Sequence, residues 1–589
     1  MASIVVLKSR EGREYVYLKE SYRVKDKVRT RTLKSYGRLE ELEAKEPGIL
    51  ERLKAQVKAG TLPGAEKKNV SISYNLDTPI SFNQKNYGWK ILNDVYQELN
   101  ITSVLKKIKR KSKYDIDEIL KLLVFGRILE PQSKSRTVKN QSLLWGNWNV
   151  EELQMYRSLK YLSAAKEDIQ LKVHESIVKH IGREATLVFY DVTNYYFETD
   201  LDDEDIIDEE TGEIIEEGLR RRGPSKERRP KPIVQMGLFM DSNGIPISYK
   251  LFRGNQTDPI TYLPAIEQVK EQFGLERIIV VADKAMNSAK NVTAMRNAKN
   301  EANQKDEIKG DGWLFSQKHR GSRGVAKVIQ EFVLDEKGWQ YNEDLTFGKK
   351  SMIRKRKLSD GKTVDEKVVV TWNKKYAVRE KIRRDGALEY IESLTNPERF
   401  RASCKRGGKK YIEMYELDKE TGERKPLSPF LDIDYDKVEF DEQFDGINVL
   451  VTSEIDMNDD EIISRYHELT KIEDCFRITK TEFDARPVYV QLKNHIEAHF
   501  LTCFLALVIL RVIQYTTEYQ LSVERIVEAL NSATTCELGK GYDHVQANDD
   551  MILLNQKFGL DWEHAYIKSG KIAKYANGWV TTFFDSLKK

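Results

Sequence analysis

The chain has 589 residues, more than one hydrophobic core can organise, so three or four domains are expected. Its 97 basic and 93 acidic residues nearly cancel, which excludes nucleic-acid binding through overall charge and leaves that function to local basic patches. The four cysteines form no CxxC pair and have no histidine at metal spacing, so free thiols in a reducing cytosol are expected rather than disulfides or zinc.

The N-terminal segment, residues 1–64, is predicted to be a small β-rich domain with a charged helix. Alternating residues indicate three short strands, Ile4–Lys8, Tyr15–Lys19 and Val28–Leu33. The charged helix begins near Lys45, and the linker Leu62-Pro63-Gly64 marks a domain boundary.

Residues 70–185 are predicted to form a helical DNA-binding domain. Apolar faces with a period of 3.6 indicate helices at Tyr87–Leu99, at Ile116–Ile128 and as a pair over Glu152–Ile181. Two basic connectors, Lys106–Lys113 and Pro131–Arg136, could hold the phosphates of a DNA duplex. Ordinary exposed loops explain the same charges equally well.

A short apolar strand that delivers one acid follows, at Thr186–Glu198. Residues 187–190 are apolar and β-prone, and Asp191 is the first acid after them. A carboxylate buried on such a strand needs a metal, a base or a hydrogen-bond network. The alternative is an aspartate that caps the following turn through Thr193 or Asn194.

A second strand of the same kind, Arg277–Ala282, ends in Asp283 and Lys284. Between the two acids lie the strands Pro232–Asp241 and Ile245–Arg253 and an amphipathic helix, Thr261–Phe273. The order strand, strand, strand, helix, strand is that of a ribonuclease-H-like α/β core. We assign this core to residues 186–318 and 444–516.

A highly charged arm, residues 198–231, separates the first two strands of this core. Glu198–Glu217 is acidic, and Arg220–Lys231 contains seven cations. We interpret it as a mobile arm that orders on DNA, with Lys226 and Arg228 as candidate contacts to the DNA backbone. A self-neutralising loop without function is the alternative.

A helix is expected after Asp283, at Ser288–Asn300, and then a strand at Trp313–Gln317. Residues 319–443 separate this strand from the next one, Ile447–Thr452, and are predicted to be a β-rich insertion domain. Its expected elements are strands at Val328–Leu334, Val368–Trp372 and Tyr411–Leu417 and a basic helix at Lys375–Glu392.

A third acid is predicted on one long helix, Asp459–Ala485, which starts at an Asn458 cap and stops before Pro487. Residues seven apart on a helix point in nearly the same direction, so one stripe carries Tyr466, Glu473 and Lys480. A solvated face with ion pairs, such as Glu473 with Arg477, is the alternative.

These residues resemble those of a DDE transposase of bacterial insertion sequences, in the group with a Tyr-(2)-Arg-(3)-Glu-(6)-Lys signature. The signature reads here Tyr466, Leu469, Glu473 and Lys480. Leucine therefore stands at the arginine position, and Arg465 or Arg477 would have to supply that phosphate contact. The first two acids would be Asp191, in YDVT, and Asp283, in ADKAMNS, and the GNQTD stretch at Gly254–Asp258 is also similar to the family.

The resemblance implies metal-dependent cleavage and strand transfer of DNA at terminal inverted repeats. Asp191, Asp283 and Glu473 would be the catalytic acids and would bind two Mg²⁺ or Mn²⁺ ions, which prefer hard carboxylate oxygens. The expected DNA-phosphate contacts are Tyr466, Lys480, Arg477, Lys284, Lys226 and Arg228. Related transposases use their β-rich insertion to clamp the transposon end, and the candidates for stacking on a displaced base are Trp313, Trp339 and Trp372; core packing is the alternative for each.

The expected partners are double-stranded DNA, as transposon ends and target, and a second copy of the chain in a homodimeric synaptic complex. Residues 517–589 are predicted to be a helical region, and the apolar run 500–513 is too short and interrupted to span a membrane. With no leader at the start, a cytoplasmic, nucleoid-associated bacterial protein is expected. Two other functions stay open, a related nuclease or resolvase without strand transfer and a non-catalytic DNA-binding regulator.

Overall fold

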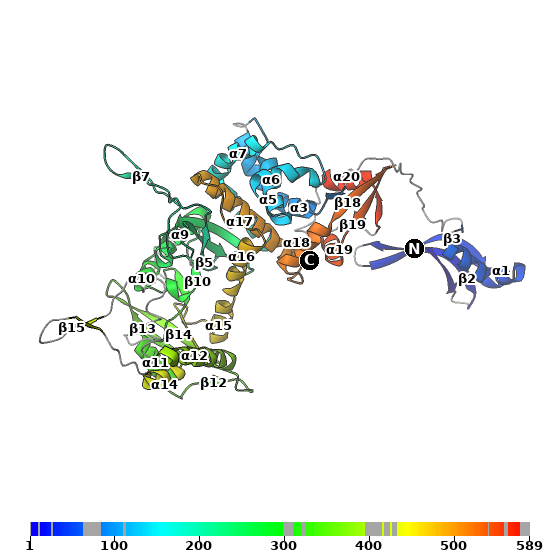
Figure 1. The fold of residues 1–589 in the computed structure, drawn as a ribbon. Helices are drawn as coiled ribbons and strands as arrows, with labels where there is room; N and C mark the ends of the chain where they lie inside the picture. Colours follow the sequence, from blue (N-terminus) through cyan, green and yellow to red (C-terminus); the bar gives the residue numbers. More distant parts are fainter. Residues whose placement is uncertain are drawn as a thin grey trace. The chain divides into compact units, whose positions relative to one another are not determined.

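The computed structural model describes residues 2–9, 12–24, 27–59, 61–62, 84–109, 113–227, 229–298, 310–320, 325–394, 415–417, 424–426, 433–539, 541–558 and 564–577. The chain divides into two compact units, Met1–Gly88 with Ser532–Phe583, and Trp89–Asn531 (Figure 1). The predicted linker at Leu62-Pro63-Gly64 lies mostly outside the described residues.

The first unit begins with the three predicted strands. They form an antiparallel sheet of β1 (Ala2–Lys8), β2 (Glu14–Val24) and β3 (Lys27–Arg38). Two helices, α1 (Leu39–Lys45) and α2 (Ile49–Ala59), follow in place of the one charged helix expected from Lys45. Val16, Leu18 and Leu53 are buried together in one small core.

The C-terminal part of this unit contains a second sheet, with strand order β20-β19-β18-β4. Its elements are β4 (Gln84–Asn86), β18 (Thr534–Gly539), β19 (Tyr542–Gln546), α19 (Asp549–Lys557), β20 (Tyr566–Lys568) and α20 (Ser569–Asn577). The prediction of a purely helical region over 517–589 is therefore wrong. β-Branched and aromatic residues such as Thr534, Thr535 and Tyr542 favour strands there.

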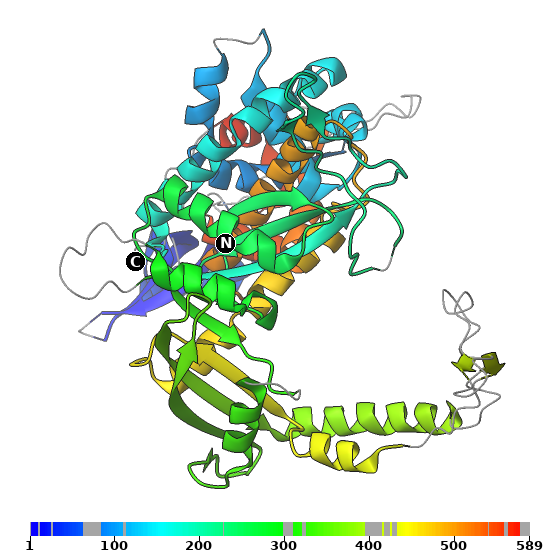
Figure 2. The same ribbon diagram turned by 90° about the vertical axis from the view of Figure 1, so that its left-hand side faces the viewer.

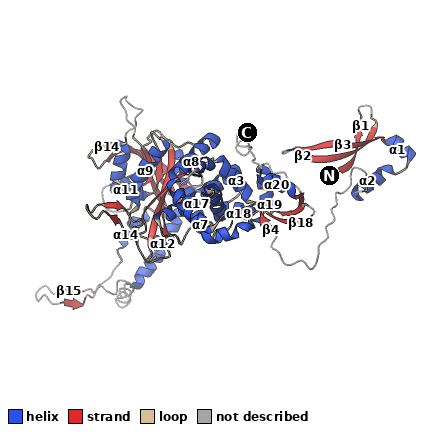
Figure 3. Cartoon of the chain, turned by 90° about the horizontal axis from the view of Figure 1, so that it is seen from above, coloured by secondary structure: helices blue, strands red, loops and turns tan. Residues whose placement is uncertain are grey.

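The second unit is built on a nine-stranded sheet with the order β12-β13-β14-β17-β11-β10-β5-β8-β9. Its strands are β5 (Leu187–Tyr196), β8 (Ile233–Met240), β9 (Pro246–Arg253), β10 (Ile279–Ala282), β11 (Gly312–Ser316), β12 (Gln340–Tyr341), β13 (Phe347–Lys357), β14 (Thr363–Asn373) and β17 (Ile447–Thr452). Figure 3 shows helices packed around these strands.

Five strands of this sheet have the order expected of a ribonuclease-H-like core. In space they run β9-β8-β5-β10-β11, which is third, second, first, fourth, fifth in chain order. β5 is antiparallel to β8 and parallel to β10, and β10 is parallel to β11. The connecting helices are α9 (Asp258–Phe273) and α10 (Ala289–Asn297). β8 is buried at every residue, because the sheet is covered on both faces.

Among its described residues, the segment predicted as a β-rich insertion, 319–443, forms a separate sheet of only two short strands. β13 and β14 form a long hairpin, and β14 pairs with β17, so the hairpin extends the core sheet. The helices of the segment are α11 (Val325–Leu334), α12 (Lys374–Leu394) and α14 (Tyr435–Glu442), and β15 (Tyr415–Leu417) pairs with β16 (Arg424–Pro426). Figure 2 shows α12 extending outward from the sheet.

The strand predicted at Val328–Leu334 is wrong, because this stretch is the helix α11. Ile329 and Val333 are buried, four residues apart, whereas Val328 and Leu334 are exposed. A spacing of four places residues on one helical face, and the apolar run alone did not distinguish a helix from a strand.

The described residues of the predicted helical domain form six α-helices, and at least four of these contact one apolar helix, α17 (Lys493–Thr516). The six helices are α3 (Trp89–Glu98), α4 (Ile101–Lys109), α5 (Ile116–Leu129), α6 (Lys134–Lys139), α7 (Glu152–Ala164) and α8 (Lys166–Ile181), and α18 (Val523–Ser532) follows α17. α17 contacts α3, α5, α7 and β9, which joins the helices to the sheet (Figure 3). By length and composition α17 could cross a membrane, but 94% of its most apolar window is buried inside the protein.

The predicted long helix at Asp459–Ala485 is two helices, α15 (Asp459–His467) and α16 (Thr470–Thr481). Asn458 caps α15 as expected, by accepting a hydrogen bond from the Asp460 N–H at 2.9 Å. Between the helices the backbone bonds join residues three apart, from Leu469 N–H to the Tyr466 carbonyl at 3.1 Å. This tighter turn ends the single helical stripe on which the prediction relied.

Candidate active site

The first two predicted acids lie side by side on neighbouring parallel strands. In the ladder of β5 and β10, Val281 is opposite Phe189. Continuing this register by two residues sets Asp283 opposite Asp191. Residues at one level of a parallel sheet point to the same face, and neighbouring strands are about 4.8 Å apart. The topology therefore brings together two carboxylates that are 92 positions apart in the sequence.

A third polar residue, Ser316, continues the same row. β10 is parallel to β11 with Ala282 opposite Phe315, so Ser316 follows opposite Asp283. The Ser316 hydroxyl donates to Asp283 Oδ1 at 3.2 Å. We call Asp191, Asp283 and Ser316 the acid row.

One oxygen of each aspartate is held by backbone. Asp191 Oδ1 accepts the Val192 N–H at 2.8 Å, and Asp283 Oδ1 accepts the Lys284 N–H at 2.6 Å. Among the described residues, none donates a hydrogen bond to Oδ2 of either aspartate. Each carboxylate thus keeps an oxygen for another partner.

The pKa of Asp191 is affected by burial and by the charged groups around it. Burial raises the pKa of Asp191 to about 6, the Lys226 ammonium and the Val192 N–H lower it, and the charges of Asp258 and Asp283 raise it. The neighbouring negative charges therefore favour the protonated form of Asp191.

The Tyr466 hydroxyl is affected by the charges of all three predicted acids. Burial raises the pKa of its hydroxyl to about 12, a hydrogen bond with Ser316 lowers it, and the charges of Asp283, Glu473 and Asp191 raise it again. The tyrosine from α15 therefore lies near the acid row and near Glu473 on α16. The helix break does not separate these two members of the signature.

Two lysines lie beside Asp191 from different parts of the chain. Lys480, at the end of α16, donates to Thr193 Oγ1 at 2.6 Å. Lys226, from the charged arm, donates to the Val192 carbonyl at 2.7 Å. Burial and the Lys226 charge lower the pKa of Lys480 to about 8, and Asp191 opposes this.

Two family models match the sequence. One is described as the N-terminal domain of IS1634 family transposases and matches residues 4–66. The other is described as a transposase DDE domain and matches residues 210–509, which is half of the chain. The chain belongs to the DDE transposase family. The second match includes Asp283, Glu473 and Lys480 and begins after Asp191.

Solved transposase structures also match part of the chain. They include a Mos1 mariner paired-end complex with Mn, at 13% identity and a TM-score of 0.11, and a Mos1 transposase paired-end complex with the left transposon end, at 12% and 0.12. Each match covers 42% of this chain, and 64% and 66% of the respective Mos1 chains. Such low TM-scores carry no argument for fold or function. No curated protein matches the sequence.

The donor set of the DDE domain fits a hard divalent cation at two of its three positions. The Oδ2 atoms of Asp191 and Asp283 are oxygen donors of the kind that Mg²⁺ and Mn²⁺ prefer. Glu473 is exposed on α16, and its charge helps to raise the pKa of Tyr466. Among the described residues, no group of three acidic, histidine or cysteine side chains is close enough to hold a metal ion. Glu473 therefore does not complete the set in this conformation.

The other predicted DNA contacts differ in where they lie: Arg477 is paired on α16, Lys284 adjoins the acid row, and Arg228 is outside the described residues. The Arg477 guanidinium donates to Asp474 at 2.8 Å and pairs with Glu524 on α18 at 2.6 Å. Lys284 follows Asp283 and is exposed. Arg228 lies outside the described residues.

The charged arm is extensively paired with itself and its surroundings. The Arg220 guanidinium donates to Asp203 at 2.9 Å, and Asp205 pairs with Arg221 at 2.7 Å and with Arg253 at 3.0 Å. Its two short strands are β6 (Ile206–Ile207) and β7 (Ile214–Glu216). A self-neutralising loop would form ion pairs of this kind. That the arm orders on DNA stays a prediction.

The three tryptophans suggested for base stacking belong to the sheet region. Trp313 is fully buried in the core of the second unit, and its indole N–H donates to Glu366 at 3.1 Å. This burial leaves Trp313 no face for a base. Trp339 and Trp372 are partly buried against the same core.

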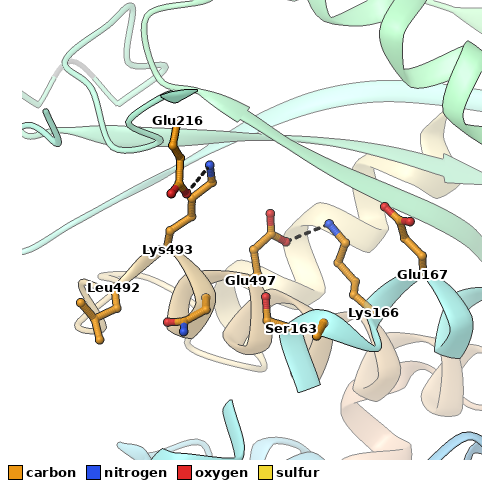
Figure 4. Close-up of a pocket in the computed structure, with 9 residues that line it drawn as sticks. Ser163, Lys166, Glu167, Glu216, Leu492, Lys493 and Glu497 are labelled. Carbon is orange, nitrogen blue, oxygen red and sulfur yellow. Dashed lines mark hydrogen bonds and ion pairs between the residues drawn. The ribbon is translucent and has the colours of Figure 1, made fainter. Parts of the chain in front are cut away.

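A pocket of about 580 Å³ lies away from the acid row, between the α7–α8 junction, the arm and the start of α17 (Figure 4). Both of its lysines have acidic partners, since Lys166 pairs with Glu497 at 3.0 Å and Lys493 with Glu216 at 2.8 Å. These pairs join the arm and α8 to α17, and the pocket adds no group to the candidate active site.

Ser316 and Asp258 are two residues of the site that were not predicted from the sequence. Asp258 begins α9 and lies close enough to Asp191 to raise its pKa. The signal for Asp258 was its place in the GNQTD stretch. Ser316 carried no signal of its own, because only the strand register sets it beside Asp283.

Proposed function

We propose that this chain is the transposase of a bacterial insertion sequence, which cuts DNA at terminal inverted repeats and joins the freed ends to target DNA. The observation that carries the proposal is the row of Asp191 and Asp283 on adjacent parallel strands, with Tyr466 close to both and to Glu473. Membership of the DDE family supports the same reaction class.

The reaction requires a water activated as nucleophile and a stabilised leaving oxygen. Asp191 and Asp283 would hold divalent cations, Mg²⁺ or Mn²⁺, with their free Oδ2 atoms, and Glu473 would be the third ligand. Two such ions, when bound, supply both the nucleophile and the charge stabilisation. The row geometry fixes the two aspartates before DNA arrives, whereas Glu473 depends on how α16 lies against the sheet.

The lysines beside Asp191 are proposed to bind the phosphate that is cleaved. Lys480 and Lys226 each have one hydrogen bond to β5, through Thr193 and the Val192 carbonyl, and their remaining N–H groups can donate to phosphate oxygens. Tyr466 is proposed to orient the same phosphate through its hydroxyl. After cleavage, the freed 3′ hydroxyl would attack a second phosphodiester at the same place.

The proposed partners are duplex DNA and a second copy of the chain. The basic connectors of the helical domain and the insertion would contact the transposon end, and a homodimer would hold two ends in one synaptic complex. The proposed location is the bacterial cytoplasm, where the DNA is.

The experiment is cleavage of a duplex that carries the terminal repeat of the element, in Mg²⁺, by wild type and by Asp191→Asn, Asp283→Asn and Glu473→Gln. Each substitution removes a charged oxygen donor without changing size, so each should abolish cleavage and leave end binding within a few-fold. Glu461→Gln, an exposed acid on α15, is the matched control and should cleave normally.

Full cleavage by any one of the three variants would remove that residue from the site. If wild type hydrolyses the DNA but forms no joined products, the chain is a nuclease or resolvase without strand transfer. If wild type binds the ends but never nicks them, it is a non-catalytic DNA-binding regulator.

A further inference from the structure

Asp283 is held by a chain of hydrogen bonds that begins in the β13–β14 hairpin. The Arg356 Nη1 of β13 donates to Asn287 Oδ1 at 2.7 Å. Asn287, four residues after Asp283, donates to the Ser316 carbonyl and to Gln317 Oε1, both at 3.0 Å. Ser316 in turn donates its hydroxyl to Asp283 Oδ1. The loop after β10 is thus fixed at both of its ends.

The chain of hydrogen bonds is anchored on a buried carboxylate, Glu366 of β14. Its side chain is fully buried and accepts from Arg356 Nη1 at 2.8 Å, from Arg354 Nη2 at 2.6 Å and from the Trp313 indole N–H at 3.1 Å. Any movement of this buried carboxylate would break one of its hydrogen bonds and leave charge uncompensated. Its three donors therefore hold it in place. The guanidinium of Arg356 is therefore held firmly against Asn287.

We propose that Arg356 and Asn287 are positioning residues for Asp283, so that the β13–β14 hairpin orients a metal ligand of the active site. The inference rests on the proposed function. Hydrogen-bond partners of metal ligands set ligand orientation, and their loss typically weakens metal binding about 10- to 100-fold. Here Ser316 bonds Asp283 directly, and Asn287 links Ser316 to Arg356 of the hairpin.

Arg354 supplies a matched control. Arg354 and Arg356 are both nearly buried, lie on the same strand and bond the same Glu366. Only Arg356 also bonds Asn287. Arg354→Gln and Arg356→Gln therefore remove the same kind of ion pair, and only the second removes the link to the Asp283 loop.

The test is Mn²⁺ binding to the full-length chain without DNA, measured by the electron paramagnetic resonance of free Mn²⁺, together with thermal unfolding and end cleavage. We expect the two arginine variants to lower the melting temperature similarly. Arg356→Gln should weaken Mn²⁺ binding at least about tenfold, and Arg354→Gln should leave it within about twofold. Asn287→Ala should match Arg356→Gln in Mn²⁺ binding, and the double variant should be no worse than either, because both break one link.

Equal Mn²⁺ binding by the two arginine variants would overturn the inference and leave Arg356 a purely structural residue. Loss of DNA-end binding by Arg356→Gln with unchanged Mn²⁺ binding would also overturn it, since the arginine would then contact DNA. The proposed function fails separately, if Asp283→Asn neither weakens Mn²⁺ binding nor stops cleavage.

Discussion

Lys134, at the start of α6, is an amine buried beside other basic groups. Its Nζ lies 3.2 Å from His499 Nδ1, and the Arg127 guanidinium is near enough to act on it. Burial and, to a smaller extent, the Arg127 charge together lower the pKa of Lys134 to about 7. Burial also lowers the pKa of His499 well below its usual value. The native state therefore disfavours a proton on Lys134 that the unfolded chain holds up to about pH 10.5.

This shift predicts how stability changes with pH. Between pH 7 and 10.5 the unfolded chain binds a proton at Lys134 that the native chain releases, so the free energy of unfolding rises with pH. The slope from one such group is at most about 1.4 kcal/mol per pH unit. Wild type should gain stability relative to Lys134→Met between pH 7 and 9. Urea unfolding at pH 7, 8 and 9 measures this, and a constant difference between the two proteins would contradict it.

Single residues of the site were predictable where the local sequence itself was unusual. Asp191 follows the apolar run 187–190 within β5, Asp283 follows the apolar strand β10, and an acid in either place has few structural explanations. Ser316, Asn287 and Arg356 are polar residues in ordinary surroundings. Their importance depends on strand register and on a hairpin far along the chain, which no local pattern contains.

Among the elements, the β8–β9 hairpin is fixed to the end of α8 by a buried ion pair. Arg183 Nε donates to Asp241 Oδ2 at 2.6 Å, and both side chains are almost fully buried. The other oxygen of Asp241 accepts the Ile245 N–H at 2.9 Å, and Arg183 Nη2 donates to the Pro246 carbonyl at 2.9 Å. The pair therefore closes the turn and joins it to the helical part.

Removing one partner of this pair should be strongly destabilising. Asp241→Asn leaves the Arg183 charge buried without a full counter-ion, which should cost about 3–5 kcal/mol of unfolding free energy. Glu175→Gln on α8 breaks a pair with Lys172 that is largely exposed, and should cost less than about 1 kcal/mol. Chemical denaturation of both variants compares them. A similar small loss in both would show that the hairpin is not held by this pair.

Most helices and strands followed from periodicity, and the failures have physical causes. α11 was predicted as a strand because its apolar residues are dense and β-branched, although their burial has helical spacing. The α15–α16 break was not predicted because no proline or glycine marks it. In the C-terminal region the strands are short, and β18 pairs with β4, far away in the sequence, so the local signal was weak.

At the scale of the whole second unit, one sheet connects the active site with the segment that interrupts it. β14 pairs with β17, β17 with β11, and β11 with β10, so the hairpin and the acid row belong to one continuous ladder. The sequence order of the first five strands predicted the core. It did not predict that the insertion would add strands to the same sheet. The edge of a sheet offers backbone groups to any strand whose register and twist fit, so no particular sequence pattern marks this pairing.

Asp191 and Asp283 are proposed to form a divalent-metal site for phosphodiester chemistry. The decisive measurement is anomalous diffraction from crystals of the full chain with terminal-repeat DNA and Mn²⁺. We expect a manganese peak within about 2.5 Å of an oxygen from each aspartate, with Glu473 beside it. DNA bound with no manganese between the two aspartates, or with manganese only at other acids, would contradict it.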